Sequence, residues 1–91
     1  MTMEYGRVCM TRHIMDAIVE DGEFHSSVMN MIFRYVSGDW GEMCETDKRL
    51  NDNAVKCGDR VLASYDSKKG KVYIITEWDR SATTILFANE Y

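Results

Sequence analysis

The sequence predicts an α+β domain in which a largely helical first half precedes an antiparallel sheet. Between residues 13 and 57, apolar side chains recur every three or four positions, which is the period of a helix buried on one face. From Arg60 onward, apolar and polar residues alternate, as they do in a half-buried strand. The 91 residues are 45% hydrophobic and 29% charged, without proline, so we expect one globular domain over residues 1–91.

The first two predicted elements are short. Residues 6–11 alternate in polarity and predict a strand with Val8 and Met10 on one face. Residues 13–21 then predict a helix of two turns that ends before Gly22. The apolar positions of this helix are Ile14, Ala17 and Ile18.

The second predicted helix has the strongest pattern. Apolar residues recur at every fourth position from Phe24 to Val36, and two more widen the stripe, so we expect this face to be core. The expected core positions are Phe24, Val28, Met31, Ile32, Tyr35 and Val36. A third helix is predicted over residues 46–57 and closes at Gly58, because glycine readily takes the left-handed conformation found at helix ends. Its expected buried positions are Leu50, Ala54 and Cys57.

A turn with two glycines, Gly38-Asp39-Trp40-Gly41, separates the second helix from the third. The glycines allow a sharp bend, which we expect to bury Trp40 against the helix pair. Asp39, followed three residues later by Glu42, matches an acidic form of the capping box. Asp39 is therefore predicted to cap the next helical turn.

Three strands are predicted after the helices, over residues 60–65, 72–77 and 83–88. Polar loops at 66–70 and 78–82 join them into an antiparallel meander. The predicted order is β-α-α-α-β-β-β, with the helices packed on one face of the sheet. The first strand is expected to join this sheet at an edge, and either edge is open to it.

The charge balance is acidic, with 15 Asp and Glu against 11 Lys and Arg and a formal net charge of −4. Proteins that bind duplex DNA carry a basic face, so this balance argues against that class. Two acidic sets are candidates for docking on a basic partner protein, because acidic patches speed such encounters. The first set is Asp16, Glu20, Asp21 and Glu23, and the second is Glu42 and Glu45. Ordinary solvated surface is the alternative interpretation of both sets.

Catalytic and metal-binding motifs do not stand out. The chain has no G-x-S-x-G elbow, phosphate-binding glycine loop or H-E-x-x-H pair, and its two histidines lack a recognisable nucleophile partner. Cys9, Cys44 and Cys57 lack C-x-x-C spacing, so they are predicted to be free thiols without a metal. We expect no enzyme activity, no cofactor and no metal.

The residues around the last predicted turn form a dense polar set. Asp79 is expected to cap turn amides and Arg80 to pair with a carboxylate, whereas Glu77 and Trp78 are candidate partner-binding residues. A large aromatic side chain in an exposed turn is typical of an interface anchor. Tyr65, Tyr73 and Trp78, with the lysines of the preceding hairpin, also suggest an alternative function in binding single-stranded nucleic acid.

No apolar run approaches the roughly 18 residues that a membrane helix needs, and residues 1–12 contain no apolar core of a secretory signal. The expected location is therefore the cytoplasm, without a membrane partner.

Three segments carry a resemblance to a known family. They are GRVCMTR at residues 6–12, GDWGEMCETDKRLND at 38–52 and VYIITEWDRSATTILFANEY at 72–91. Together they resemble a family of small proteins carried by phages, plasmids and integrative elements of Firmicutes. Trp78 and the Ala88-Asn89 pair depart from the family pattern, which affects loop detail. Family members bear the label plasmid-related protein or that of a restriction-system modification subunit. The second label does not suit this chain, because amino-methyltransferases need a proline-bearing loop and a larger cofactor-binding domain.

The resemblance implies an accessory protein of a mobile element. The leading functional hypothesis is an inhibitor of the anti-CRISPR type, which binds a bacterial defence effector such as a CRISPR–Cas complex without catalysis, in the cytoplasm of the host bacterial cell. Its acidic side chains would occupy a basic nucleic-acid channel of the effector. The alternatives are a regulatory or structural interaction module of the element and the single-strand binder described above.

Overall fold

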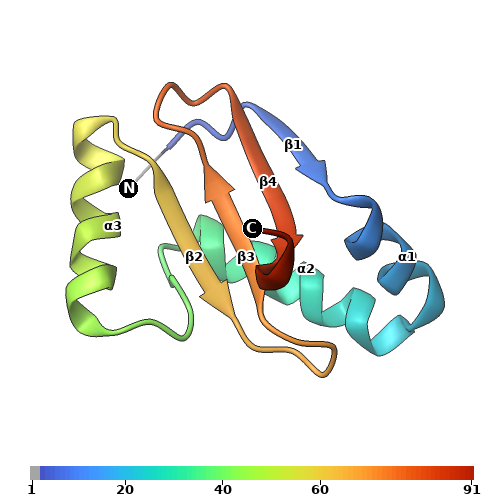
Figure 1. Cartoon of the computed structure of the whole chain (residues 1–91). Helices are drawn as coiled ribbons and strands as arrows, with labels where there is room; N and C mark the ends of the chain where they lie inside the picture. Colours follow the sequence, from blue (N-terminus) through green and yellow to red (C-terminus); the bar gives the residue numbers. More distant parts are fainter. Residues whose placement is uncertain (1–2) are drawn as a thin grey trace.

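The computed structural model describes residues 3–91, and its elements follow the predicted order (Figure 1). They are β1 (Arg7–Met10), α1 (Arg12–Glu20), α2 (Gly22–Val36), α3 (Glu45–Cys57), β2 (Val61–Tyr65), β3 (Val72–Thr76), β4 (Ala82–Phe87) and a 3-10 turn, η1 (Ala88–Glu90). The predicted α+β class is confirmed. The prediction of one domain over residues 1–91 includes Met1 and Thr2, which lie outside the described residues.

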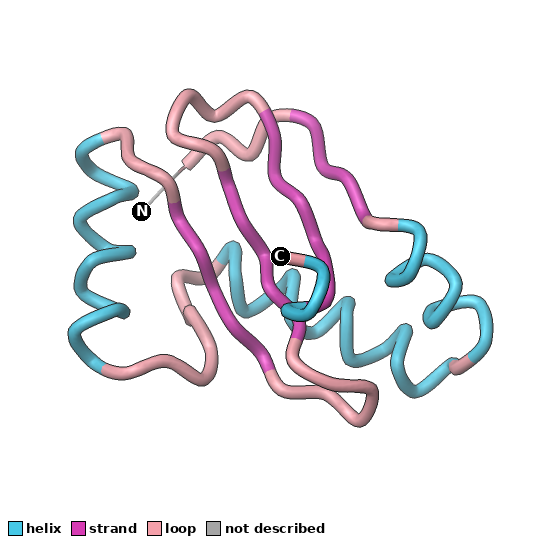
Figure 2. The backbone as a smooth tube through the Cα atoms, viewed as in Figure 1, coloured by secondary structure: helices cyan, strands magenta, loops and turns pink. Residues whose placement is uncertain are grey.

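The four strands form one mixed sheet in the order β1-β4-β3-β2 (Figure 2). The β2–β3–β4 meander is antiparallel, as predicted, and Ile74 in its centre lies opposite Ala63 on one side and Ile85 on the other. β1 joins the free edge of β4 in parallel, with Val8 beside Thr83. The sheet is therefore mixed and not wholly antiparallel. The long segment between β1 and β4 supplies the connection that a parallel pair requires.

α2 covers one face of the sheet and provides most of the helical part of the core. Its buried positions are Phe24, Val28, Met31 and Tyr35, and the apolar side chains of the sheet that share this core are Val61, Ala63, Tyr65, Val72, Ile74 and Ile85. The predicted core stripe is confirmed in part at Ile32, which is half-buried and packs against the core, and is wrong at Val36, which is exposed. A spacing of four residues advances about 40° around the helix at each step, so a strict four-residue stripe drifts away from the core.

α3 lies beside β2 at the edge of the sheet (Figure 1). Asn51 Nδ2 donates to the Leu62 carbonyl at 2.7 Å, and Asn51 Oδ1 accepts the Leu62 N–H at 3.3 Å. The buried amide of Asn51 in the helix therefore provides hydrogen-bond partners for the backbone of β2 at this edge of the sheet. The predicted burial of Leu50 and Cys57 is wrong, since both are exposed. Gly58 closes the helix in the left-handed conformation, as predicted, with φ 76°.

The connection between α2 and α3 is strand-like. Gly41 forms an isolated β-bridge with Ser64 of β2, and the Glu42 N–H donates to the Ser64 carbonyl at 2.7 Å. Asp39 Oδ1 accepts the Gly41 N–H at 3.0 Å. The prediction that Asp39 caps a helical turn is therefore wrong, because an aspartate can equally satisfy the amide two residues later in a turn.

Trp40 projects from this connection into the core, as predicted. Its side chain is 3% exposed, and its ring meets the Tyr35 ring edge-on at 5.4 Å. The indole Nε1 donates to Asp52 Oδ1 of α3 at 2.9 Å. Trp40 thus joins α2 to α3 through one apolar and one polar contact.

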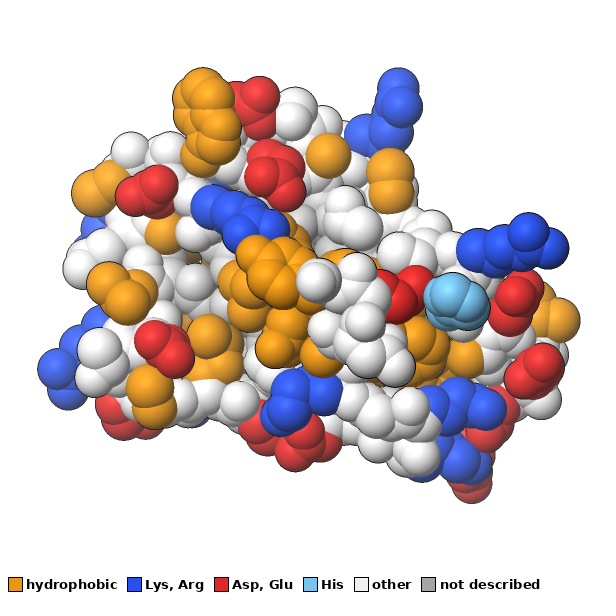
Figure 3. Space-filling model, in the orientation of Figure 1, with side chains coloured by type: hydrophobic (Ala, Val, Ile, Leu, Met, Phe, Trp, Pro, Cys, Tyr) orange, Lys and Arg blue, Asp and Glu red, His pale blue; other side chains and the backbone are white. Residues whose placement is uncertain are grey.

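The C-terminal residues cover part of the other face of the sheet (Figure 1). The Tyr91 ring packs edge-on against Tyr73 of β3 at 5.8 Å, and Arg60 donates to the Tyr91 hydroxyl. Hydrophobic side chains gather near the middle of this face in Figure 3, over the strands and η1. The two faces of the sheet are therefore covered unequally, one by a helix and the other by a short tail.

Candidate functional site

The first acidic set borders an open depression between α1 and the C-terminal turn. The depression has a volume of about 1020 Å³, and its lining residues are His13, Asp16, Ala17, Glu20, Lys69, Phe87, Asn89 and Glu90. Asp16 and Glu20 are one helical turn apart on α1, so their exposed carboxylates lie on the same side of the helix. Neither carboxylate forms an ion pair within the described residues 3–91.

The other two members of the first set have a partner that the linear sequence does not show. Lys68, in the loop between β2 and β3, places its Nζ 3.0 Å from Asp21 Oδ2 and 2.7 Å from Glu23 Oε2. Asp21 also caps α2 by accepting the N–H groups of Glu23 and Phe24. Lys68 and these amides lower the pKa of Asp21. Asp21 is thus a structural residue, whereas Glu23 remains exposed and accessible to a partner.

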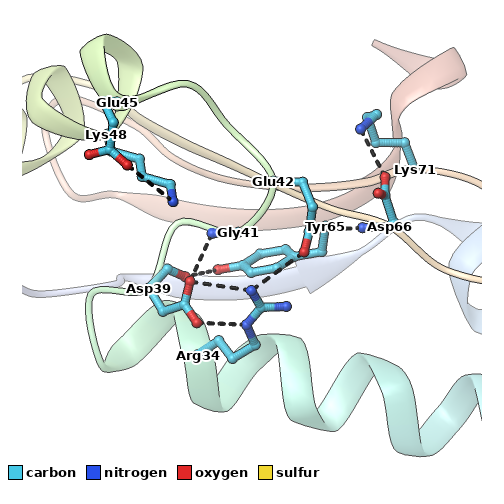
Figure 4. A network of polar contacts seen from close by, with 9 residues as sticks. All are labelled: Arg34, Asp39, Gly41, Glu42, Glu45, Lys48, Tyr65, Asp66 and Lys71. Atoms are coloured by element: carbon cyan, nitrogen blue, oxygen red, sulfur yellow. Dashed lines mark hydrogen bonds and ion pairs between the residues drawn. The ribbon is translucent and has the colours of Figure 1, made fainter.

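Of the second set, only Glu42 lies in the polar network around Arg34 (Figure 4). Arg34 donates to both carboxylate oxygens of Asp39, at 2.7 and 3.3 Å, and its guanidinium carbon lies 5.0 Å from the centre of the Tyr65 ring. Glu42 lies 3.6 Å from Arg34 and accepts the Asp66 N–H at 3.0 Å, so its contacts stabilise the fold. Glu45 is exposed on α3, with Lys48 3.9 Å away.

Glu90, a carboxylate that sequence reasoning did not single out, holds the C-terminal turn against α1. It accepts hydrogen bonds from Thr11 Oγ1 at 2.9 Å and from the Phe87 N–H at 2.8 Å, and lies 2.8 Å from His13 Nδ1. Burial alone would raise the pKa of Glu90, but the contacts with His13, Phe87 and Thr11 lower it. The three-residue spacing from Phe87 to Glu90 is the only local signal, since Thr11 lies 79 positions away.

The turn between β3 and β4 divides into structural and exposed residues. Asp79 Oδ1 accepts the Ser81 N–H at 3.0 Å, which confirms its predicted role as a turn cap. The predicted pairing of Arg80 with a carboxylate is wrong, because Arg80 donates to the backbone carbonyls of Ala54, Asp59 and Glu77. The carboxylate of Glu77 instead lies 3.6 Å from Arg60.

Trp78 lies at the tip of the same turn and is 63% exposed, as expected for this position. The other aromatic residues of the suggested nucleic-acid surface are less accessible. Tyr65 is buried on the α2 face, and Tyr73 packs against Tyr91. Burial raises the pKa of the Tyr65 phenol, which donates to the Asp39 carbonyl at 2.7 Å. The three aromatic residues therefore do not form one stacking platform.

The cysteines are dispersed over the fold. Cys9 is half-buried on β1, whereas Cys44 and Cys57 are exposed at the two ends of α3, and all three are free thiols. Among residues 3–91, no group of three or more His, Cys, Asp or Glu side chains is placed to hold a metal ion.

None of the described helices has the length and apolar character needed to span a membrane. Comparison with known protein families finds no family model that matches the chain, and comparisons with curated proteins and with solved structures likewise find no match.

Proposed function

We propose that this chain is a mobile-element protein of the anti-CRISPR type, which binds a bacterial defence effector in the host cytoplasm and blocks it without catalysis. The proposed contact is the acidic surface on α1 formed by Asp16 and Glu20, joined by Glu23 at the start of α2 where a partner cation replaces Lys68. Its target would be a basic groove that normally holds nucleic acid, as in CRISPR effector complexes. The family resemblance of the sequence provides the biological setting of the proposal.

The proposal rests on the exposure of Asp16 and Glu20 and on their lack of an ion-pair partner among residues 3–91. Most acidic side chains that we considered as contacts have partners within the fold, including Asp21 with Lys68 and Glu42 with Arg34. Asp16 and Glu20 face solvent at the rim of an open depression without an ion-pair partner among residues 3–91. Carboxylates in this state can pair with lysine and arginine side chains of a partner without first breaking an internal contact.

Trp78 is a second proposed contact. Its exposed indole is not part of the core, and Glu77 beside it is held by Arg60. Aromatic side chains of this kind often contribute a large share of the binding energy in an interface.

The test measures phage plating on a bacterial host that carries an active CRISPR nuclease, together with capture of the nuclease complex by the tagged protein. The wild-type chain should restore plating and retain the complex. The double variant Asp16→Asn/Glu20→Gln should weaken binding by about tenfold, and a higher salt concentration should reduce the difference. Trp78→Ala should weaken binding without changing the melting temperature.

The matched control is Glu4→Gln/Asp59→Asn, which removes the same charge at two exposed residues outside the depression. It should bind and protect like the wild type. If the wild-type chain neither protects phage nor retains the complex, the proposed function is wrong. If the two double variants lose binding equally, the effect comes from net charge and the proposed contact is wrong.

A further inference from the structure

β1 leaves one edge of the sheet open within the described residues 3–91. The sheet order ends with β1, and the N–H groups of Arg7 and Thr11 donate to carbonyls of the β4 side, those of Ser81 and Ile85. Because backbone groups alternate in direction along a strand, the N–H and C=O groups of Val8 and Met10 point away from β4. At the opposite edge, β2 is covered by Gly41, Glu42 and Asn51. The unpaired edge is therefore that of β1.

The side of α2 next to this edge is apolar. Val8, Ile32 and Val36 line one groove of about 100 Å³ together with Tyr5 and Tyr35. Met29 and Val36 lie on the same side of the helix as Ile32, and Phe33 follows at the outer surface. The opposite side of α2 faces β2 and carries Arg34, which contacts Tyr65 and Asp39.

The apolar surface beside the open edge is comparable in size to the largest apolar patch of a typical monomer. Val8 is 57% exposed, and Met29, Phe33 and Val36 are also exposed. Together the four side chains expose on the order of 400 Å² of apolar surface, a patch size that is often functional. Two such patches with the backbone between them approach the roughly 1,200 Å² at the lower end of stable interfaces.

We propose that β1 pairs with β1 of a second copy of this chain in antiparallel orientation, so that the two sheets join into one continuous sheet. The sequence around Cys9 is self-complementary in this register. Val8 lies opposite Met10 of the second copy, and both side chains belong to the α2 face. Arg7 lies opposite Thr11 of the second copy, so the two Arg7 side chains of the dimer do not face each other. The apolar flanks of the two α2 helices then lie on the same face and cover the central strands.

The register predicts the position of Cys9 in the dimer. Its backbone groups point toward β4, so the two copies of Cys9 form the non-hydrogen-bonded pair at the two-fold axis. The Cα atoms of such a pair are about 4.5 Å apart, which lies within the range of a disulfide. Cys44 and Cys57, on α3 at the other edge of the sheet, lie far from the axis in this arrangement.

The test combines mass measurement in solution with thiol crosslinking. Light scattering after gel filtration should give a mass that rises with concentration from one chain of 10.5 kDa toward two. In a variant that keeps only Cys9, diamide should oxidise the two facing thiols to a disulfide and produce covalent dimers. Variants that keep only Cys44 or only Cys57 should crosslink at least about tenfold more slowly, although both thiols are more exposed.

Val8→Lys should shift the chain to the monomer, because it places a charge in the apolar centre of the interface. Leu50→Lys, on an α3 residue that is 60% exposed, is the matched control and should leave the dimer unchanged. Both variants should keep the wild-type melting temperature under conditions where the chain is monomeric. A monomer at all concentrations, a dimer insensitive to Val8→Lys, or crosslinking by Cys44 as fast as by Cys9 would each overturn the proposal. These outcomes do not depend on binding to a defence effector.

Discussion

Arg80 shows how one side chain can join elements that are distant in the sequence. Its Nη2 donates to the Ala54 carbonyl at 2.8 Å, and its Nη1 donates to the Asp59 carbonyl at 2.6 Å. Ala54 belongs to the last turn of α3, where the helix dipole is negative, and its carbonyl also accepts the N–H groups of Gly58 and Asp59 at 3.0 Å. Arg80 itself has φ 60°, a conformation that residues other than glycine rarely adopt. The turn after β3 therefore stabilises the end of α3.

Replacement of Arg80 should test this contact. Arg80→Ala should lower the free energy of unfolding by about 1 to 2 kcal/mol and the melting temperature by several degrees, because it leaves charged hydrogen bonds to the backbone unmade. Arg80→Gly should cost less, since glycine tolerates the positive φ. Arg49→Ala, at an exposed position of α3, is the control in thermal unfolding. Equal melting temperatures for Arg80→Ala and Arg49→Ala would contradict this role.

At the scale of the elements, the connection between α2 and α3 is held by a close approach of two backbones. A Cβ atom on Gly41 would overlap the Ser64 carbonyl oxygen and approach the Tyr65 ring, and Gly41 has φ 85°. Gly58 has a similar φ of 76°, but a Cβ atom there would meet no other atom within 4 Å. Alanine substitution at the two glycines therefore distinguishes the free-energy cost of a left-handed backbone conformation from the cost of a steric overlap of the new Cβ atom.

Alanine at these two positions should have different effects. Gly58→Ala should cost about 1 kcal/mol, which is the strain of a left-handed conformation. Gly41→Ala should cost several kcal/mol in addition, because the bridge to Ser64 must open. Urea unfolding measures both values, and the fluorescence of Trp40 reports whether the connection has moved. Similar losses for the two variants would show that Gly41 is needed only for its φ.

The element pattern can be predicted where local periodicity determines it. Spacing predicts the three meander strands and the main helix, and the conformational freedom of glycine predicts the end of α3 and the burial of Trp40. The capping box at Asp39 fails because a short polar side chain serves a turn and a helix equally well. The predicted face of α3 is confirmed at Ala54, which is buried, and wrong at Leu50 and Cys57. The helix contacts β2 through the amide of Asn51, which apolar spacing cannot reveal.

The candidate site can be predicted only in part, because its electrostatics depend on tertiary contacts. The acidic residues are evident from the sequence, but the partner of Asp21 and Glu23 is Lys68, more than 40 positions away. The anchoring of Glu90 by Thr11 and His13 likewise joins the two ends of the chain. Long-range pairs of this kind leave no signal in composition or spacing. Only the structure therefore distinguishes carboxylates that have a partner within the fold from those that have none among the described residues.

At the scale of the whole molecule, three carboxylates with lowered pKa hold separate parts of the fold together. Asp21 joins the start of α2 to the loop before β3, Asp39 holds the connection after α2 through Arg34, and Glu90 fixes the C-terminal turn to α1. Hydrogen bonds from Arg34 and the Gly41 amide lower the pKa of Asp39. Each folded-state pKa lies below its unfolded value, so the folded chain binds fewer protons in acid than the unfolded chain.

The ordinary pKa values are 4.5 for Glu90 and 3.8 for Asp21 and Asp39. The free energy of unfolding should therefore decrease as the pH falls through these values, and it should decrease further at lower pH. Above these values the stabilisation should be complete. Urea midpoints measured from neutral pH to about pH 3 provide the test. Glu90→Gln should be less stable at neutral pH and lose less on acidification. A wild-type midpoint that stays constant over this range would contradict the linkage.

The parallel pairing of β1 with β4 also determines the order in which the molecule can be completed during synthesis. Among the described residues the only strand partner of β1 is β4, and most of the chain separates the two, as the pairing of Arg7 with Ala82 shows. A nascent chain that has released β1 and all three helices from the ribosome still lacks the strand on which β1 must pair. This part of the sheet therefore forms only after β4 has left the ribosome, and its formation must close a long loop, which slows folding.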